Sequence, residues 1–362
     1  GGSAGSALAA RLSADPSISV CLLEAGPSDT SALIHCPGGL ALLGKKGQAN
    51  WKFETVPQAG LNGRRGYQPR GKVLGGSSSI NAMIYARGTA SDYDHWASLG
   101  NSGWSYADVL PYFRKSEGNE RAASQFVEPN LHGFSGPLNV KEHTSPSPYG
   151  ACFIKAANQA GYPTNLDFNG TDQNGVGMFQ VTQKAGERFS VAKAYLTPAL
   201  QRSNLTVVCN AATTHIMLDG TTATGVAYNL GNAACQALAK REVIVSSGAF
   251  GSPQLLMLSG IGDAAHLQSL GIPVIQHLPG VGANLQDHLD TTLVVDAPHR
   301  KDLMGLSLHG LLRAIKGIVE GLATGVGRVL FHPPDGLREP RTWTISAALA
   351  GEVPWTGRDR LA

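Results

Sequence analysis

The sequence has few charges, few cysteines and no long apolar run, and each shortage excludes a class of protein. Charged residues make up 15% of the 362 residues and the net charge is +3, so no basic surface indicates a nucleic-acid partner. No apolar run approaches the roughly 20 residues that would cross a bilayer, and no signal peptide is visible at the first residues. The composition therefore indicates a globular protein with a sizeable core.

The cysteines are also uninformative as a metal or disulfide framework, because they are odd in number and widely spaced, with no C-x-x-C pair. This usage favours a reducing, cytoplasmic compartment. His132 and His143 have no third ligand at a useful spacing, so we expect solvated loop histidines and no metal site. The five cysteines are Cys21, Cys36, Cys152, Cys209 and Cys235.

Glycine, in contrast, is abundant, with 45 residues, whereas roughly 7% is its usual share. Residues 1–12 match the end of a G-x-G-x-x-G turn that runs into an amphipathic helix, and residues 17–24 are typical of a buried strand. In a dinucleotide-binding fold the pyrophosphate lies at that helix N-terminus, and an acid about twenty residues later binds the ribose hydroxyls. Glu24 occupies the position of the acid. We expect the first glycine of the motif and the preceding strand to be missing from the N-terminus.

A second glycine-rich segment, residues 70–88, combines paired glycines with three serines and Asn81. Glycine allows backbone to pass close to a flat cofactor, and Ser and Asn supply compact hydrogen bonds. The alternative interpretation is a Gly/Ser surface loop. Trp51, in the long segment before it, either contacts a cofactor or simply packs.

The remaining periodicity predicts helices and a small β-meander that turns at Asp219 and Gly220. A buried strand over 241–249 is expected to end in small residues. No periodicity is found over 328–362, so we expect a loosely ordered, atypical tail. The predicted helices span 90–99, 106–117 and 188–199, and the predicted meander strands span 204–210, 213–218 and 223–230.

The chain resembles the glucose–methanol–choline (GMC) family of flavoprotein oxidoreductases, and within it the choline dehydrogenase and aliphatic alcohol dehydrogenase branch. The resemblance implies an α/β fold, with a Rossmann-like FAD-binding sheet, an inserted β-meander and the beginning of an α+β substrate-binding domain. It implies a FAD-binding domain over 1–290, a truncated substrate-binding domain over 291–327 and the tail over 328–362. The segments that carry the resemblance are 1–12, 20–27, 71–94, 248–262 and 280–288.

The resemblance also implies a site. The ADP half of FAD would lie on the first turn and Glu24, and the flavin against the central segment, with Thr213 near the adenine. Ile80 stands where the covalent branch has a flavin-linking histidine, so FAD should be bound non-covalently. The expected cofactor-binding residues are Gly2, Ser3, Ala4, Gly5, Glu24, Ala25, Trp51, Val73, Gly76, Ser77, Asn81, Ala82, Met83, Thr213, Ser247, Gly248 and Ala249.

No catalytic residue is assigned, since the catalytic histidine of the family lies beyond the C-terminus of this chain, and a structural role is expected for His288. The implied reaction is oxidation of a primary alcohol to an aldehyde by hydride transfer to FAD, with electrons passed to a quinone-like acceptor. A choline dehydrogenase, an O₂-using alcohol oxidase, a nicotinamide dehydrogenase and an inactive nucleotide-binding fragment are the alternatives. We expect the chain as written to be poorly stable, to bind FAD weakly or not at all, and to oxidise primary alcohols at no more than trace rates. An amphipathic stretch over 303–322 leaves peripheral association with the inner membrane open.

Overall fold

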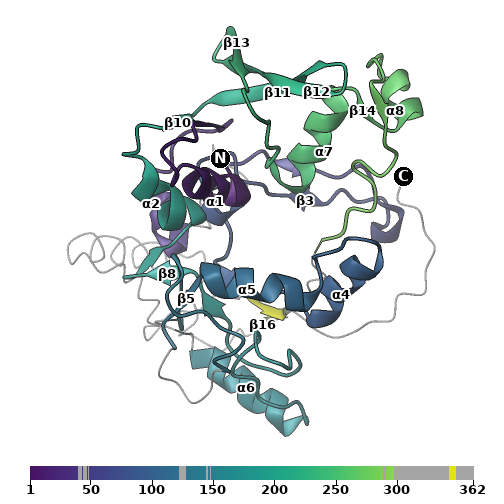
Figure 1. The fold of residues 1–362 in the computed structure, drawn as a ribbon. Helices are drawn as coiled ribbons and strands as arrows, with labels where there is room; N and C mark the ends of the chain where they lie inside the picture. Colours follow the sequence, from purple (N-terminus) through teal and green to yellow (C-terminus); the bar gives the residue numbers. More distant parts are fainter. Residues whose placement is uncertain are drawn as a thin grey trace.

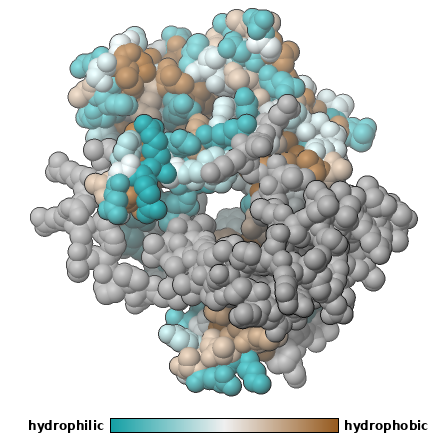
Figure 2. Space-filling model, turned by 180° about the vertical axis from the view of Figure 1, so that it is seen from behind, coloured by the Kyte–Doolittle hydropathy of each residue, from teal (hydrophilic) through white to brown (hydrophobic). Residues whose placement is uncertain are grey.

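The computed structural model of the chain describes residues 1–39, 43, 47, 49–121, 128–143, 146, 148–287, 291–296 and 342–347. Its upper part carries an antiparallel sheet above α1 and α7, and its lower part carries the helices α4, α5 and α6 (Figure 1). On the face drawn in Figure 2, hydrophilic and hydrophobic residues are intermixed over the upper part of the molecule. The predicted α/β class is confirmed.

The N-terminal unit consists of one helix and two parallel strands. Helix α1 (Ser3–Leu12) is followed by strand β1 (Val20–Leu23), which pairs in parallel with β10 (Leu205–Val208). Parallel neighbours need a crossover connection, and here half of the chain, residues 24–204, lies between the two strands. The small apolar face of α1 packs on this pair, which fixes the helix N-terminus at the carboxyl end of β1. The buried residues of this core are Ala9, Ala10, Leu22, Leu74, Ala192, Leu196, Ala199 and Leu205.

The meander forms around the predicted turn, but not with all the predicted strands. The predicted strand over 204–210 is β10, which pairs with β1 instead, and a strand over 233–238 takes the third place. Strands β11 (Ala211–Asp219), β12 (Thr222–Leu230) and β13 (Ala233–Leu238) are antiparallel neighbours. Gly220 turns the chain between the first two strands with φ +57°, a left-handed conformation that glycine adopts without steric cost. Helix α7 (Gly248–Leu258) packs against β11.

The predicted strand over 241–249 is wrong. Residues 242–246 have no regular secondary structure, α7 begins at Gly248, and Ile244 is 45% exposed. The apolar alternation is typical of a strand, but a strand also needs a hydrogen-bonded neighbour. Within the described residues no strand pairs with this segment.

The segment between β1 and α4 is built from short elements around a second core. Strand β2 (Phe53–Glu54) pairs with β3 (Tyr67–Gln68), and the one-turn helix η3 (Gly76–Ser79) precedes β4 (Ile84–Tyr85). The core cluster beneath them anchors the loop backbone, so that the glycine-rich segment is held in place without long regular elements. Its buried residues are Ile34, Leu43, Ala49, Val73 and Ile80.

Two of the predicted helices form almost as expected, as α4 (Ala90–Ser98) and α5 (Tyr106–Ser116), and each begins at a capping box. The predicted helix 188–199 is shorter and is not α-helical: a wide π-helical turn, η4 (Ala192–Leu196), runs into a tight 3₁₀ turn, η5 (Thr197–Ala199). The lower part also contains α6 (Pro148–Gln159) and the short strands β5 (Glu117–Asn119), β6 (Leu138–Val140), β7 (Gln180–Val181), β8 (Gln183–Lys184) and β9 (Glu187–Arg188).

Near the C-terminus, β16 (Thr291–Asp296) pairs antiparallel with β17 (Thr342–Ala347). Strand β17 lies in the tail for which the sequence predicts no regular structure, and the domain boundaries stay a prediction.

His288 and the stretch 303–322 lie outside the described residues. None of the helices in the described part of the chain has the length and apolarity needed to span a bilayer. The other elements are α2 (Ala32–His35), η1 (Pro37–Gly39), η2 (Ala59–Leu61), β14 (Ile261–Gly262), α8 (Ala264–Ser269) and β15 (Gln276–His277).

Candidate functional site

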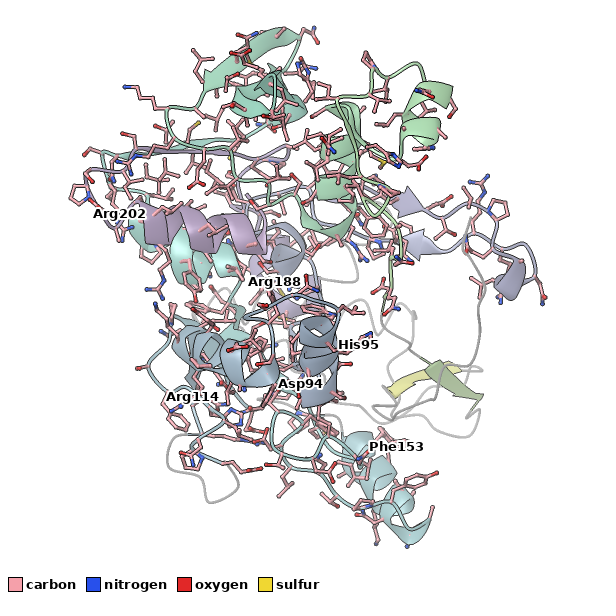
Figure 3. All side chains as sticks on the ribbon, turned by 45° about the vertical axis from the view of Figure 1, so that its right-hand side comes forward. Asp94, His95, Arg114, Phe153, Arg188 and Arg202 are labelled. Atoms are coloured by element: carbon pink, nitrogen blue, oxygen red, sulfur yellow. The ribbon has the colours of Figure 1, made fainter. Side chains whose placement is uncertain are left out.

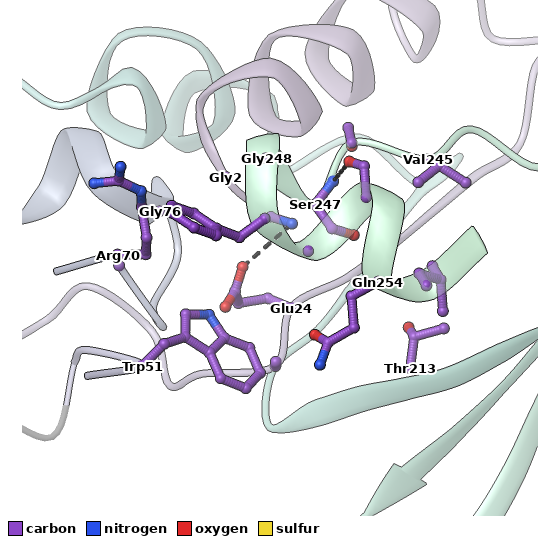
Figure 4. A pocket seen from close by; sticks show the side chains of 18 of the residues that line it. Gly2, Glu24, Trp51, Arg70, Gly76, Thr213, Val245, Ser247, Gly248 and Gln254 are labelled. Atoms are coloured by element: carbon purple, nitrogen blue, oxygen red, sulfur yellow. Dashed lines mark hydrogen bonds and ion pairs between the residues drawn. The ribbon is translucent and has the colours of Figure 1, made fainter. Parts of the chain in front are cut away.

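A cavity of about 600 Å³ opens between α1, the end of β1, η3 and α7 (Figure 4). This volume is within the range of small-molecule and cofactor sites, roughly 300–1,000 Å³. Its walls come from segments far apart in the sequence, including the start of β11 and the loop that carries Trp51. The cavity therefore depends on the packing of several distant segments and not on one local motif.

Two helix N-termini face this cavity without a side-chain cap. Neither Gly2, at the N-cap of α1, nor Ser247, at the N-cap of α7, makes a capping hydrogen bond, and neither helix has an acid in its first turn. Uncapped N-termini carry unpaired N–H groups and the positive end of the helix dipole, which favour anions. Gly248 has φ +81° and no atom within 4 Å of the position of a Cβ, so it borders open space. This pair of termini fits a pyrophosphate.

Gly76 allows the central glycine–serine segment to touch the start of α1. A Cβ on Gly76 would lie 2.7 Å from the Cα of Gly2, and the φ of Gly76 is +54°. The backbone N–H of Gly75 donates to the carbonyl of Gly1 at 2.8 Å, which fixes the contact. Any side chain at Gly76 would separate the two segments that form this wall of the cavity.

Glu24 places a buried carboxylate at the carboxyl end of β1, with 6% of the residue exposed. Its Oε1 accepts a hydrogen bond from the N–H of Gly26 at 2.8 Å, and its Oε2 lies 3.2 Å from the nitrogen of Gly1. A carboxylate has about four acceptor positions, so two contacts leave capacity for ligand hydroxyl groups. The position and chemistry fit the ribose-binding acid expected from the sequence.

Aromatic and cationic side chains form the opposite wall. Trp51 and Phe53 are stacked, with ring centroids 5.7 Å apart and planes at 4°, and Phe250 lies 5.7 Å from Phe53. The guanidinium carbon of Arg70 lies 4.7 Å from the centroid of the Phe250 ring. Trp51 is 41% exposed and lines the cavity. Of its two sequence interpretations, the cofactor-facing one therefore fits its position better than burial in a core.

Most of the residues expected from the sequence are brought together here. Gly5, Val73, Asn81, Ala82 and Met83 are not among the residues that line the cavity. Gly5 is buried against Ser246 and Val73 lies in the second core, whereas Asn81 and Ala82 are exposed beyond η3. The expected residues that line the cavity are Gly2, Ser3, Ala4, Glu24, Ala25, Trp51, Gly76, Ser77, Thr213, Ser247, Gly248 and Ala249.

Sequence reasoning missed other lining residues. Phe53 could have been found from its spacing, because residues two apart in an extended segment share a face, and Trp51 had been singled out. Arg70 and Gly71 lie in the glycine–serine segment 70–88, but nothing in the pattern of this segment distinguishes lining from buried positions. Phe250 and Gln254 project from the first turns of α7, and no local signal marks them.

A separate buried polar cluster surrounds His132, and here the expectation of a solvated histidine is wrong. His132 is 1% exposed, its Nδ1 lies 2.9 Å from Oε1 of Glu117, and its Nε2 lies 2.9 Å from Oδ2 of Asp167. Burial by itself lowers the pKa of His132, but hydrogen bonds and charges from Asp167 and Glu117 outweigh it and raise that pKa to about 9. Arg87 contributes a second cation to Glu117. His143, by contrast, is exposed.

Within the residues that the structure describes, no group of three or more His, Cys, Asp or Glu side chains could hold a metal ion.

The family model described as GMC oxidoreductase matches residues 1–290. Mitochondrial choline dehydrogenase of Homo sapiens is 48% identical over 328 residues, which cover 89% of this chain and 54% of that protein. Alcohol dehydrogenase (acceptor) of Pseudomonas putida is 46% identical over 319 residues, covering 88% of this chain and 57% of that protein. The chain thus spans about half the length of these curated relatives.

Two solved structures of similar fold cover most of this chain and just over half of their own length. Pyridoxine 4-oxidase from Mesorbium loti has a TM-score of 0.75 and 34% identity, covering 80% of this chain and 56% of that one. A FAD-dependent oxidoreductase from Chaetomium thermophilum has a TM-score of 0.78 and 33% identity, covering 89% of this chain and 57% of that one.

Proposed function

The chain belongs to the GMC oxidoreductase family, whose members bind FAD, and from that premise we propose that the cavity between α1, Glu24 and α7 is the FAD site of this chain. The residues present fit the cofactor, since an acid for ribose hydroxyls, two anion-binding helix ends and a glycine-lined surface open into one space. The family match ends at residue 290, which supports a FAD-binding domain over 1–290 followed by substrate-binding and tail segments.

Each part of the site has one task in this proposal. The N-terminus of α1, with Ser3 and Ala4, and that of α7, with Ala249, bind the pyrophosphate through backbone N–H groups. Glu24 accepts hydrogen bonds from ribose hydroxyls, and Thr213 borders the adenine. The segment from Gly76 to Met83 supports the flavin ring, which accepts a hydride from the substrate when FAD is bound. In this proposal the end of the same segment also supports the flavin ring, through Asn81, Ala82 and Met83, although these residues do not line the cavity.

FAD is held non-covalently in this proposal. Ile80 occupies the position where the covalent branch has a histidine, and its side chain is 7% exposed and packs in the second core. An aliphatic side chain has no nucleophile for a bond to flavin. The ring is therefore retained by contacts and hydrogen bonds alone.

For the whole protein we propose oxidation of a primary alcohol to an aldehyde, with electrons passed to a quinone-like acceptor. The likeness to alcohol dehydrogenase (acceptor) of Pseudomonas putida supports this assignment. Choline oxidation is the second candidate, because human choline dehydrogenase is similar to the same degree. An oxygen-dependent choline dehydrogenase from Rhizobium etli is 48% identical over 289 residues, and this likeness supports O₂ as an alternative electron acceptor. An inactive nucleotide-binding fragment remains the alternative for this chain by itself. The cytoplasmic location and any peripheral membrane contact stay predictions.

The observation that carries the proposal is the convergence of Glu24 and two uncapped helix ends on one cavity. The test is titration calorimetry of the full chain with FAD and, separately, with NAD⁺, followed by an absorbance spectrum of the desalted protein. Saturable FAD binding with flavin absorbance, and no NAD⁺ binding, is expected. Binding of NAD⁺ in preference to FAD would favour a nicotinamide dehydrogenase, and binding of neither would overturn the site.

A further inference from the structure

The side chain of Arg188 is a completely buried cation beside the central glycine–serine segment (Figure 3). Its Nε donates to the carbonyl of Ile34 at 2.9 Å. Its Nη1 donates to the carbonyls of Ser78 and Asn81 at 3.3 and 2.7 Å, and to Oδ1 of Asn81 at 2.8 Å. Arg188 therefore joins β9 to segments that are at least 107 residues away along the chain.

The charge of Arg188 has no counter-ion within the described residues. Every acceptor of its hydrogen bonds is uncharged, and its buried Nη2 has no partner there. Burial lowers the pKa of Arg188 to about 10, so the side chain keeps its charge at neutral pH. Arg87, which is also buried, differs because it forms an ion pair with Glu117.

The contact with Asn81 controls a backbone conformation. Oδ1 of Asn81, which accepts from Arg188, also accepts from the N–H of Met83 at 3.1 Å. Met83 has φ +63°, a left-handed conformation that costs a non-glycine residue on the order of 1 kcal/mol or more. Arg188 thus fixes the side chain that holds this turn. Ser78 is fixed from the same side, because the N–H of Val191 donates to its Oγ at 3.0 Å.

We propose that Arg188 is a positioning residue of the flavin site, which fixes the turn from Asn81 to Met83 and supplies a permanent positive charge behind the segment that supports the flavin. The proposal rests on the proposed function, since it takes the Gly76–Met83 segment as the flavin support. Two features of the structure favour it over a purely structural role. No carboxylate within the described residues pairs with Arg188, and Asn81 and Ala82 are exposed although the guanidinium that holds Asn81 is buried.

The unpaired charge is the more informative feature. Removing a charge from water without a partner costs several kcal/mol. A neutral amide side chain could donate hydrogen bonds to the same carbonyls without that cost. Hydride transfer brings one negative charge and two electrons from the substrate to the flavin, while the proton of the hydroxyl goes to a base. A nearby fixed cation stabilises the more negative redox state, so Arg188 would raise the midpoint potential of bound FAD.

The test uses the full chain at saturating FAD and compares Arg188→Gln with Arg188→Lys. In Arg188→Gln we expect FAD affinity to fall about tenfold, and the affinity for reduced FAD relative to oxidised FAD to fall about tenfold more, which equals about 30 mV for a two-electron couple. In Arg188→Lys the charge remains but the planar fork is lost. We therefore expect a potential close to wild type together with weaker FAD binding.

Arg202→Gln is the matched control. Within the described residues the acceptors of Arg202 are also uncharged, the carbonyl of Ala10 and Oγ of Ser13, and they lie away from the flavin segment. It should leave the potential unchanged. A wild-type potential in Arg188→Gln, or an equal fall in both Arg188 variants, would overturn the proposal. If Arg188→Gln does not fold, the Arg188→Lys variant provides the test. An FAD affinity of Arg188→Lys equal to that of wild type would refute the positioning role of Arg188. Failure of the wild-type chain to bind FAD would refute the proposed function instead.

Discussion

Oε1 of Glu117 lies 2.9 Å from Nδ1 of His132, and both side chains are completely buried. The other ring nitrogen of His132 faces Asp167, so each N–H of a protonated imidazole has a carboxylate acceptor. Arg87 lies against the second oxygen of Glu117. The cluster therefore holds two cations and two carboxylates, which link β5 and the 167–169 loop to the end of the glycine–serine segment.

The first prediction concerns the pH dependence of stability. The pKa of His132 is about 9 in the folded chain, above about 6.5 for an unperturbed histidine. A raised pKa contributes stability that is complete below pH ~6.5 and is lost as the pH rises through about 9. The loss is of order 3 kcal/mol at about 1.4 kcal/mol per pKa unit. Urea unfolding between pH 6 and 10, at fixed salt, measures it.

His132→Gln should remove most of this pH dependence, and it should be less stable than wild type at pH 6. The control is His95→Gln, since His95 is exposed on α4, and it should keep the wild-type profile. A wild-type free energy of unfolding that does not change between pH 6.5 and 9 would show that His132 is neutral in the fold.

The second prediction is that Glu24→Ala weakens FAD binding by roughly 1–3 kcal/mol, the usual cost of a lost hydrogen bond to a charged acceptor. Calorimetry at pH 7 measures it. Glu54→Ala, which changes an exposed carboxylate outside the cavity lining, is the control. Equal FAD affinity of Glu24→Ala and wild type would show that Glu24 is not the ribose ligand.

The third prediction distinguishes two effects of replacing a glycine: the clash of a new side chain with a neighbouring backbone, and the strain of a left-handed backbone conformation. Gly76→Ala and Gly220→Ala both place a side chain at positive φ, but only the Gly76 Cβ meets another backbone, 2.7 Å from Gly2. Each should lose roughly 1–2 kcal/mol of stability from the left-handed conformation. Only Gly76→Ala should also reduce FAD affinity, by about tenfold or more. If thermal unfolding and FAD calorimetry change equally in both variants, the contact with α1 is not part of the site.

The fourth prediction is that FAD, once bound, is released by acid. Ile80 is buried among aliphatic residues, so precipitation with acid should leave the yellow colour in the supernatant. Colour that stays with the protein pellet, with a matching mass increase in the intact chain, would contradict non-covalent binding.

The sequence predicted the parts of the site that depend on local pattern. The helix that follows Gly2, the strand before Glu24 and the hairpin that turns at Gly220 are encoded by residues close in sequence, and the structure places them as expected. The predicted meander strand over 204–210 pairs with β1 instead, because strand partners are not encoded locally. The strand over 241–249 was wrong because its formation depends on a neighbour that the pattern does not report. Val73 and Gly5 were expected to line the site, but a signature motif does not distinguish a residue that faces a ligand from one that supports the motif from behind.

The buried polar contacts could not be predicted at all. His132 is buried because Glu117 and Asp167 approach it from positions 15 and 35 residues away, and Arg188 is buried against carbonyls from distant segments. A sequence shows that these residues are charged or polar, and the default expectation is then exposure. Only the fold shows which charges have partners and which do not.

The last prediction concerns catalysis by this chain. Hydride transfer from an alcohol carbon is fast only if the hydroxyl proton leaves to a positioned base, which contributes typically 10²–10⁴-fold. Among the described residues that line the cavity, Glu24 is the only side chain that could accept a proton at neutral pH, and the N–H of Gly26 already donates to it. We therefore expect the chain, supplied with FAD, to oxidise straight-chain primary alcohols and choline at trace rates.

Dye reduction at saturating FAD tests this expectation. A turnover near 1 s⁻¹, at the lower end of typical enzyme rates, would mean that a base exists within residues 1–362. Two variants would then locate it. Loss of turnover in Glu24→Gln, with FAD affinity retained, would assign the base to the cavity. Loss in His288→Gln would assign it to a residue outside the described part of the chain. A trace rate that neither substitution changes is the expected result, because proton removal then depends on solvent alone.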